Sequence, residues 1–323
     1  MTVNIYRSSD PGAPQLRGYT PGDVINLLNL CLVTGYGSKA AAGWTMPFTS
    51  TNVAAFKQGD GNGMYLRVDD SSATANNLRA TRCVLYENMS DVNTGTPASV
   101  PTSAQLANGI GLFTYYLGTA ANARAWKLIA TNKFFLLCIC PSDTYNINSW
   151  AVFFEGIMFG DFTSYKSGDT FNTGVWGCFN SSNSYSQTLL PLGVNSISAL
   201  SPSGYIARDT TGLGGSIVTG HSSDIAKSNS LVSGKGQLQY PSPVDGGLYL
   251  SPIWVTGGGN LGSIRGFLPG LWFCPQNVSG SLNPGDQIAG SGDLAGKTFE
   301  LWPFGGGSST QVGCVFVEIS NTW

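Results

Sequence analysis

Residues 125–140 have the sequence AWKLIATNKFFLLCIC, two apolar runs separated by the polar triplet Thr131-Asn132-Lys133. This pattern predicts a β-hairpin with strands at 125–130 and 134–140. A strand that faces water on one side alternates apolar and polar residues, whereas FFLLCIC contains no charged or strongly polar residue. We therefore expect the second strand to be buried on both faces, in the interior of a sheet-based fold.

Segments rich in β-branched and aromatic residues predict further strands on both sides of this hairpin. The chain has 43 glycines and 16 prolines among 323 residues, which indicates the many tight turns of an all-β protein. The tip at 59–63, GDGNG, predicts a hairpin loop, and the polar segment 91–109 predicts a long surface loop. The other predicted strands are 52–58, 64–69, 80–86, 112–116, 150–162, 175–179, 216–219, 265–273, 297–302 and 314–319, and 241–255 predicts a turn followed by a strand.

The segment 20–37, TPGDVINLLNLCLVTGYG, predicts the one helix of the chain, at about residues 21–34. Apolar residues recur at spacings of three and four, Thr20 is a suitable N-terminal cap, and Gly35 is a suitable stop. The helix is either a buried element around which strands pack or an ordinary surface helix. It is shorter than the roughly 20 residues that a membrane span needs, so we expect no membrane span.

These patterns together predict a mainly β protein. We expect a β-sandwich or barrel-like core with one N-terminal helix and long loops. We expect residues 1–19 to form an extended N-terminal arm and residues 20–323 to form a single β-rich unit, with a candidate seam near 180–204. The arm and the 91–109 loop are the candidate regions for contact between subunits. The candidate contact residues are Tyr6, Arg7, Pro11, Pro14, Asp91, Pro97 and Pro101.

Charged residues make up only 11% of the chain, less than half of the usual share of about 25%. The formal net charge is −2 and no basic stripe occurs, so we expect no direct binding of nucleic acid. The seven cysteines lie mostly in apolar segments without a CxxC pair, and no secretory signal is recognisable. We therefore expect buried, reduced thiols in a chain synthesised in the cytoplasm.

No motif predicts catalysis or a cofactor, so we expect a protein that is not an enzyme. His221 is the sole histidine and lies in a polar turn. The segment 290–298, GSGDLAGKT, has Ser291 where a phosphate loop needs its first glycine, and it leads into a predicted strand. The segment 257–262, GGGNLG, has the glycine spacing of a dinucleotide-binding site. Such a site must lead into a helix, and no helix is predicted after this segment. The carboxylates Glu155 and Asp161 are the candidate pair for a hydrolase.

Several segments spread over most of the chain resemble, in order, a family of tailed-bacteriophage virion structural proteins. The segments are YRSSDPGAPQLRG (6–18), NLCLVTGYGSKAAAGW (29–44), MYLRVDD (64–70), YENMSDVNTG (86–95), FGDFTSYKSGD (159–169), PSPVDGGLYLSPIWV (241–255), GDLAGKTFELW (292–302) and VFVEISNTW (315–323). The resemblance implies a virion subunit that assembles, by symmetric contacts with its own copies and other virion proteins, into the tail, neck or head-associated part of the particle.

Two other functions stay open from the sequence. One is a receptor- or glycan-binding module at the tail tip or capsid surface, with a host glycan or receptor as partner. Trp150, Trp176 and Trp254 could stack on sugar rings, although packing in the core accounts for them better. The other, more remote function is a virion-borne hydrolase.

Overall fold

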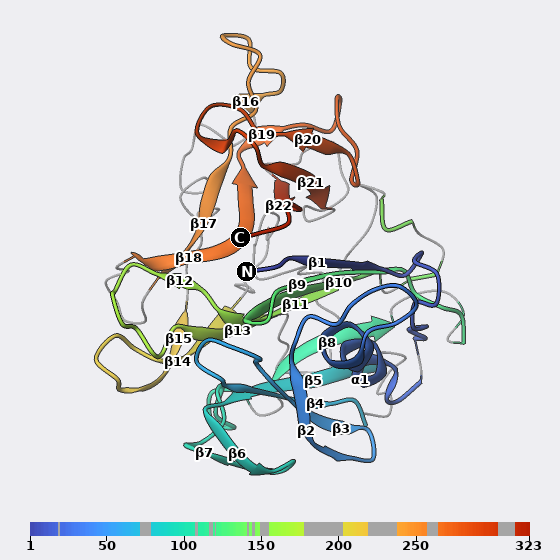
Figure 1. Cartoon of the computed structure of the whole chain (residues 1–323), viewed down its shortest axis with the longest axis vertical. Coiled ribbons are helices and arrows are strands. Elements are labelled where there is room, and N and C mark those ends of the chain that lie inside the picture. The colour runs from blue at the N-terminus through green and yellow to red at the C-terminus, as the bar shows by residue number, and fades with distance from the viewer. Residues whose placement is uncertain are drawn as a thin grey trace.

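The protein is mainly β, with several antiparallel sheets and one short helix, as the sequence predicts (Figure 1). The structure is a computed structural model. It describes residues 1–18, 20–71, 79–106, 109–115, 119, 121–140, 142–143, 146–148, 155–177, 203–218, 238–256, 264–302 and 314–323.

Three sheets form the body of the described chain. The seven-stranded sheet has the order β1 (Asn4–Arg7), β9 (Trp126–Ala130), β10 (Phe134–Ile139), β11 (Glu155–Asp161), β13 (Thr173–Gly177), β14 (Ser203–Arg208), β15 (Gly214–Val218). The five-stranded sheet has the order β2 (Thr45–Ser50), β3 (Val53–Lys57), β4 (Tyr65–Asp69), β5 (Arg79–Tyr86), β8 (Ile110–Tyr115).

The six-stranded sheet has the order β12 (Thr163–Ser164), β18 (Ile264–Cys274), β22 (Cys314–Glu318), β21 (Thr298–Trp302), β20 (Gln287–Ala289), and β17 (Ser251–Thr256) also pairs with β18. Two short pairs complete the described strands, β6 (Asn88–Asp91) with β7 (Thr94–Thr96) and β16 (Leu238–Gln239) with β19 (Gln276–Asn277). A short 3-10 helix, η3 (Gly292–Leu294), precedes β21.

The hairpin predicted at 125–140 forms β9 and β10, and it lies inside the seven-stranded sheet, between β1 and β11. All six residues of β10 are buried, which confirms the prediction of burial on both faces. Phe135, Leu137 and Ile139 belong to one hydrophobic core, whereas Phe134 and Leu136 belong to a second one. Because side chains alternate along a strand, each face of β10 fills a different core.

The seven-stranded sheet is therefore the middle layer of the molecule (Figure 1). The first core lies between it and the five-stranded sheet, with side chains such as Leu66 and Leu112 from the latter. The second core lies between it and the six-stranded sheet, with Val315 and Val317 from β22. A third cluster, which includes Phe299 and Phe316, covers the other face of the six-stranded sheet.

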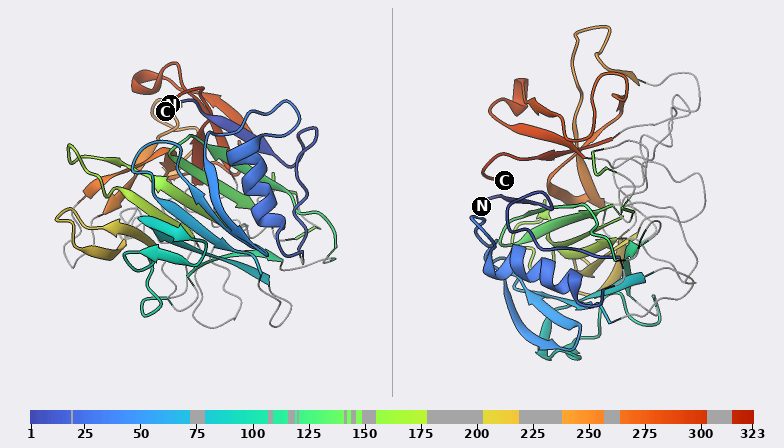
Figure 2. Two further views of the ribbon diagram at one scale, coloured as in Figure 1. Left: turned by 60° about the horizontal axis from the view of Figure 1, so that its bottom comes forward. Right: turned by 90° about the vertical axis from the view of Figure 1, so that its right-hand side faces the viewer.

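The predicted helix is present as α1 (Asp23–Leu28) followed by a π-helical segment, η1 (Asn29–Thr34). Its apolar residues face the first core, and Gly35, at φ 81°, ends it as predicted. Asn26 and Thr34 are exposed, so the helix covers the side of the sheets and is not enclosed by strands (Figure 2).

The predicted cap by the Thr20 side chain is wrong. The N-cap is Gly22, at φ 88°, and no capping side chain follows in sequence. The carboxylate of Asp70, the residue after β4, instead accepts the Val24 amide at 3.0 Å and the Thr81 hydroxyl at 2.6 Å. A residue distant in sequence thus serves the role that a local cap usually has.

The N-terminal segment differs from the predicted extended arm, because it is packed on its own chain. β1 pairs with β9, and Tyr6 is fully buried with its hydroxyl donating to the Ala40 carbonyl at 2.6 Å. Its burial raises the pKa of Tyr6 above the ordinary range. Residues 180–202 of the predicted seam near 180–204 lie outside the described residues. The division of the chain therefore stays a prediction.

Candidate functional site

The predicted contact residues fall into three groups. Tyr6, Pro14 and Pro101 are buried within the chain in this conformation, and a contact of these three with a neighbouring subunit stays a prediction. Arg7 is half-buried, and its guanidinium pairs with Glu300 at 2.5 Å. The exposed members of the set are Pro11, Asp91 and Pro97.

The exposed contact candidates do not form one surface. Pro11 lies against Gly37, at the end of the helical segment. Asp91 and Pro97 belong to the β6–β7 hairpin and the residue after it, beyond the five-stranded sheet (Figure 1). Whether either region touches a neighbouring subunit stays a prediction.

The carboxylates Glu155 and Asp161 do not form a catalytic pair. They are the first and last residues of β11, so about six strand steps of 3.3 Å, roughly 20 Å, separate them. The two carboxylates of a glycosidase lie roughly 5 to 10 Å apart. Within the described residues, no group of three or more His, Cys, Asp or Glu could hold a metal ion. His221 and the 257–262 segment lie outside these residues, and residues 290–297 contain the single turn η3 and lead into β21, as predicted.

Asp161 instead joins two sheets. Its carboxylate accepts hydrogen bonds from the Gln58 amide at 2.8 Å, the Thr173 hydroxyl at 2.5 Å and the backbone N–H of Asn62 at 2.9 Å. Gln58 and Asn62 belong to the β3–β4 hairpin of the five-stranded sheet, and Thr173 begins β13. Burial raises the pKa of Asp161 despite these donors.

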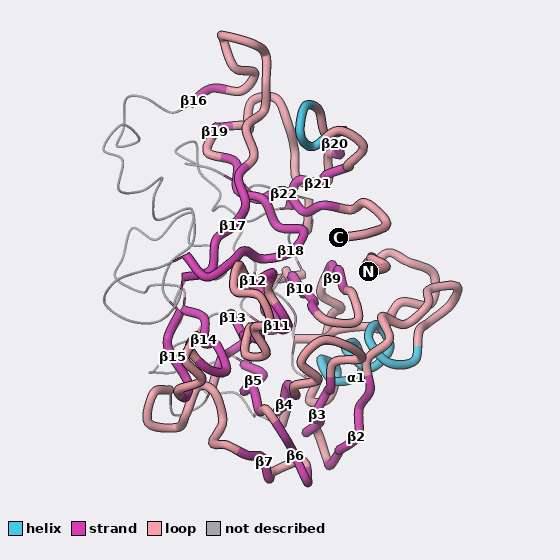
Figure 3. The backbone as a smooth tube through the Cα atoms, turned by 60° about the vertical axis from the view of Figure 1, so that its left-hand side comes forward, coloured by secondary structure: helices cyan, strands magenta, loops and turns pink. Residues whose placement is uncertain are grey.

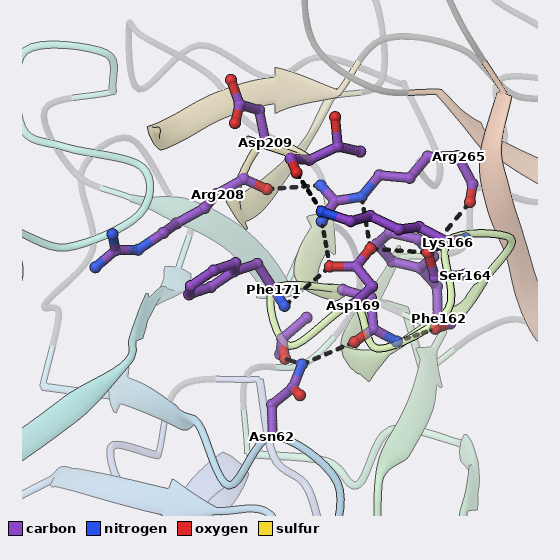
Figure 4. A network of polar contacts seen from close by, with 12 residues as sticks. Asn62, Phe162, Ser164, Lys166, Asp169, Phe171, Arg208, Asp209 and Arg265 are labelled. Atoms are coloured by element: carbon purple, nitrogen blue, oxygen red, sulfur yellow. Dashed lines mark hydrogen bonds and ion pairs between the residues drawn. The ribbon is translucent and has the colours of Figure 1, made fainter. Parts of the chain in front are cut away.

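A second polar network surrounds a buried ion pair between Asp169 and Arg265 (Figure 4). Arg265 donates from Nη2 at 2.8 Å and from Nε at 3.0 Å, and the two side chains are only 1% and 2% exposed. Asp169 also accepts the Ser164 hydroxyl at 2.7 Å and the Phe171 amide at 3.0 Å. The guanidinium lies 5.3 Å from the centre of the Phe162 ring.

The same network binds a third segment. Arg265 Nη1 donates to the Arg208 carbonyl at 2.6 Å, and Lys166 Nζ donates to the Thr210 carbonyl at 2.5 Å. The Arg208 guanidinium lies over the Phe171 ring and forms two hydrogen bonds with Glu87. We call residues 162–172, 208–214 and 264–267 the three-loop platform. Figure 3 shows its strands β12 and β18 side by side, with β14 and β15 next to them.

The three-loop platform presents apolar side chains to solvent. Tyr165 is 61% exposed, Leu213 is 70% exposed and Ile264 is 49% exposed, one from each segment of the platform. Asp209 fixes the turn that carries Leu213, because its carboxylate accepts the Leu213 amide at 3.0 Å. Half of the six large hydrophobic residues exposed in the described chain therefore lie on this platform.

Sequence reasoning missed the platform because its parts are far apart in the chain. Asp169 and Arg265 are separated by 96 positions, and neither belongs to a catalytic or binding motif. One feature of the sequence could have indicated the ion pair. The chain has few charges, and Arg265 lies beside a run of buried strand residues. An arginine in that position needs a buried acceptor.

The chain matches no protein-family model and no curated protein. In the part of the chain that the structure describes, no helix combines the length and the apolar character needed to cross a membrane.

Proposed function

We propose that this chain is a structural, non-enzymatic subunit of a tailed-phage virion that assembles through protein–protein contacts. The resemblance of its segments to that family supports the proposal, and one structural observation carries it. The three-loop platform presents Tyr165, Leu213 and Ile264 to solvent on segments joined by a buried ion pair and by hydrogen bonds. Exposed apolar side chains that gather in one region are typical of interaction surfaces.

The internal bonds of the platform make it suitable for association. A contact surface that is ordered before binding loses less conformational entropy when the partner arrives. Tyrosine is enriched among the residues that contribute most to binding, and interface centres contain few charged groups. The charges of the platform are largely used internally, because Asp169 pairs with Arg265 and Lys166 is bonded to the Thr210 carbonyl.

Light scattering on the purified chain and on a Tyr165→Ser, Leu213→Ser double variant tests this proposal. We expect the wild type to form a closed oligomer and the double variant to have a clearly smaller mass at the same concentration. Val244→Ser is the matched control, because Val244 is 90% exposed but lies outside the platform. A wild type that stays monomeric at every concentration, or an equal effect of the control, would contradict a role of the platform in self-assembly.

Antibody labelling of intact phage particles tests the virion assignment separately. Labelling confined to the tail or neck supports a position there, and labelling of the head supports a capsid-associated position. Absence of the chain from purified particles would overturn the virion proposal.

A row of aromatic side chains favours a second candidate function, the binding of a glycan. Trp254 on β17 is the register partner of Phe267 on β18, and the Phe267 ring lies 6.0 Å from the Tyr165 ring. Ile253 and Val255 point into the second core, so Trp254, which lies between them, points outward. The row crosses two strand spacings, about 10 Å, along which the apolar faces of linked sugar rings could stack.

A glycan array probed with the wild type and with Trp254→Ala tests this second function. We expect binding that the substitution abolishes, whereas Tyr249→Ala, which removes an exposed aromatic ring outside the row, leaves binding intact. An array without hits for the wild type would argue against glycan recognition.

A further inference from the structure

Cys274 and Cys314 face each other across two neighbouring strands. Cys274 is the last residue of β18 and Cys314 is the first residue of β22, and the two are directly opposite in the antiparallel register. Both side chains belong to the third hydrophobic cluster, so they project from the same face of the six-stranded sheet. The Cys274 thiol lies close enough to contribute to the raised pKa of the Cys314 thiol.

This placement satisfies the Cα-distance requirement of a disulfide. Residues directly opposite in an antiparallel pair have Cα atoms about 4.5 to 5.5 Å apart. Disulfide-bonded cysteines have Cα atoms about 4.4 to 6.8 Å apart, so the separation expected for this pair falls within the disulfide range. In this structure both thiols are free. We propose that Cys274 and Cys314 are a redox site that closes to a cross-strand disulfide when the protein meets a disulfide oxidant.

The reaction is ordinary thiol–disulfide exchange. The thiolate of one cysteine attacks oxidised glutathione, which gives a mixed disulfide and releases one glutathione thiolate. The second cysteine then attacks its partner's sulfur and releases the second glutathione. Two electrons pass from the protein to glutathione, and the protein loses two hydrogen atoms.

Burial decides how fast this reaction is. Burial and the contact with Cys274 hold the pKa of the Cys314 thiol well above its ordinary range. The Cys314 thiolate is therefore scarce, and the pair resists oxidation in the folded protein until the paired ends of β18 and β22 separate. The chain can thus fold in a reducing cytoplasm with both thiols free and acquire the crosslink later, in an oxidising medium.

Of the six described cysteines, this is the pair that the strand register brings face to face. Cys138 and Cys140 are near neighbours on one segment, where two residues of the same strand point along one face and do not face each other. Cys31 and Cys83 belong to the first core. Cys178 lies outside the described residues.

Peptide mapping after oxidation provides a direct test. Tryptic cleavage after Arg265 and Lys297 places Cys274 in peptide 266–297 and Cys314 in peptide 298–323, and neither peptide contains another cysteine. The full chain is incubated with oxidised glutathione, or refolded in a glutathione redox buffer, and its free thiols are then alkylated in denaturant. We expect a disulfide-linked species of these two peptides, the loss of two alkylated thiols, and a higher unfolding temperature than that of the reduced chain.

Cys274→Ser and Cys314→Ser are the matched variants. Each should abolish the linked species and the oxidation-dependent rise in unfolding temperature, whereas Cys83→Ser should keep both. Complete alkylation of all thiols after both treatments would overturn the proposal, as would a linkage through any other cysteine. Persistence of the temperature rise in both single variants would also overturn it.

Discussion

Replacing Asp169 by asparagine removes the charge that Arg265 needs in the three-loop platform. The two side chains are almost fully buried, and removal of one partner of a buried ion pair destabilises a protein by about 3 to 5 kcal/mol. Arg265 would keep its hydrogen bond to the Arg208 carbonyl and its contact with the Phe162 ring. We therefore expect the lower end of this range, about 3 kcal/mol, in the free energy of unfolding at pH 7.

The effect should depend on pH. Burial raises the pKa of Asp169, but the hydrogen bonds from Arg265, Ser164 and the Phe171 amide outweigh it, and the pKa lies below its ordinary value. A lowered pKa means that the carboxylate stabilises the folded state above the unfolded-state pKa of about 3.9. That stabilisation is lost as the pH falls through the folded-state pKa. The difference between the wild type and Asp169→Asn should therefore shrink below about pH 4.

Urea unfolding followed by circular dichroism, at a series of pH values, measures this difference. Cleavage by trypsin after the exposed Lys166 gives a local readout, because the variant should loosen the platform before the rest of the chain. Asp91→Asn is the matched control, an exposed acid that should change stability by less than about 0.5 kcal/mol. The double variant Asp169→Asn, Arg265→Met should lose less free energy of unfolding than the sum of the losses of the two single variants. Additive costs, or a loss for Asp169→Asn equal to that of the control, would refute the role of the ion pair.

Three further predictions concern the framework. Gly160→Ala should abolish soluble, folded protein in circular dichroism, since Gly160 has φ 135° and a Cβ would lie 2.1 Å from the Lys133 carbonyl oxygen. Asp70→Ala should lower the urea-derived stability by about 2 kcal/mol, because the Val24 amide and the start of the helix lose their acceptor. Phe135→Ala should lower it by about 3 to 5 kcal/mol, the cost of a cavity in the first core.

Local sequence patterns correctly predicted the elements whose structure depends on residues close together in the chain. The absence of polar residues in FFLLCIC predicted a strand with two buried faces, and β10 has them. The apolar spacing after Pro21 and the glycine at position 35 predicted the helix to within two residues at its start. In both cases the decisive residues lie within a few positions of each other.

Partners distant in sequence account for what the patterns missed. The polar segment around Tyr6 gives no strand signal, because its burial comes from pairing with β9, more than a hundred residues later. The helix start is bonded to Asp70 and not to Thr20 for the same reason. The platform depends on Asp169 and Arg265, which only the completed sheet order brings together.

The division of β10 between two cores has a consequence for how substitutions combine. Phe134 and Phe135 are adjacent in the chain, yet one fills the core toward the six-stranded sheet and the other fills the core toward the five-stranded sheet. Phe135 instead touches Phe159, 24 positions away, with ring centres 6.3 Å apart. Two substitutions are energetically coupled when the side chains pack together. The losses of stability caused by truncating Phe134 and Phe135 should therefore add, whereas those caused by truncating Phe135 and Phe159 should not. Along β10, each residue should therefore couple energetically with residues of its own core and not with its neighbours in the chain.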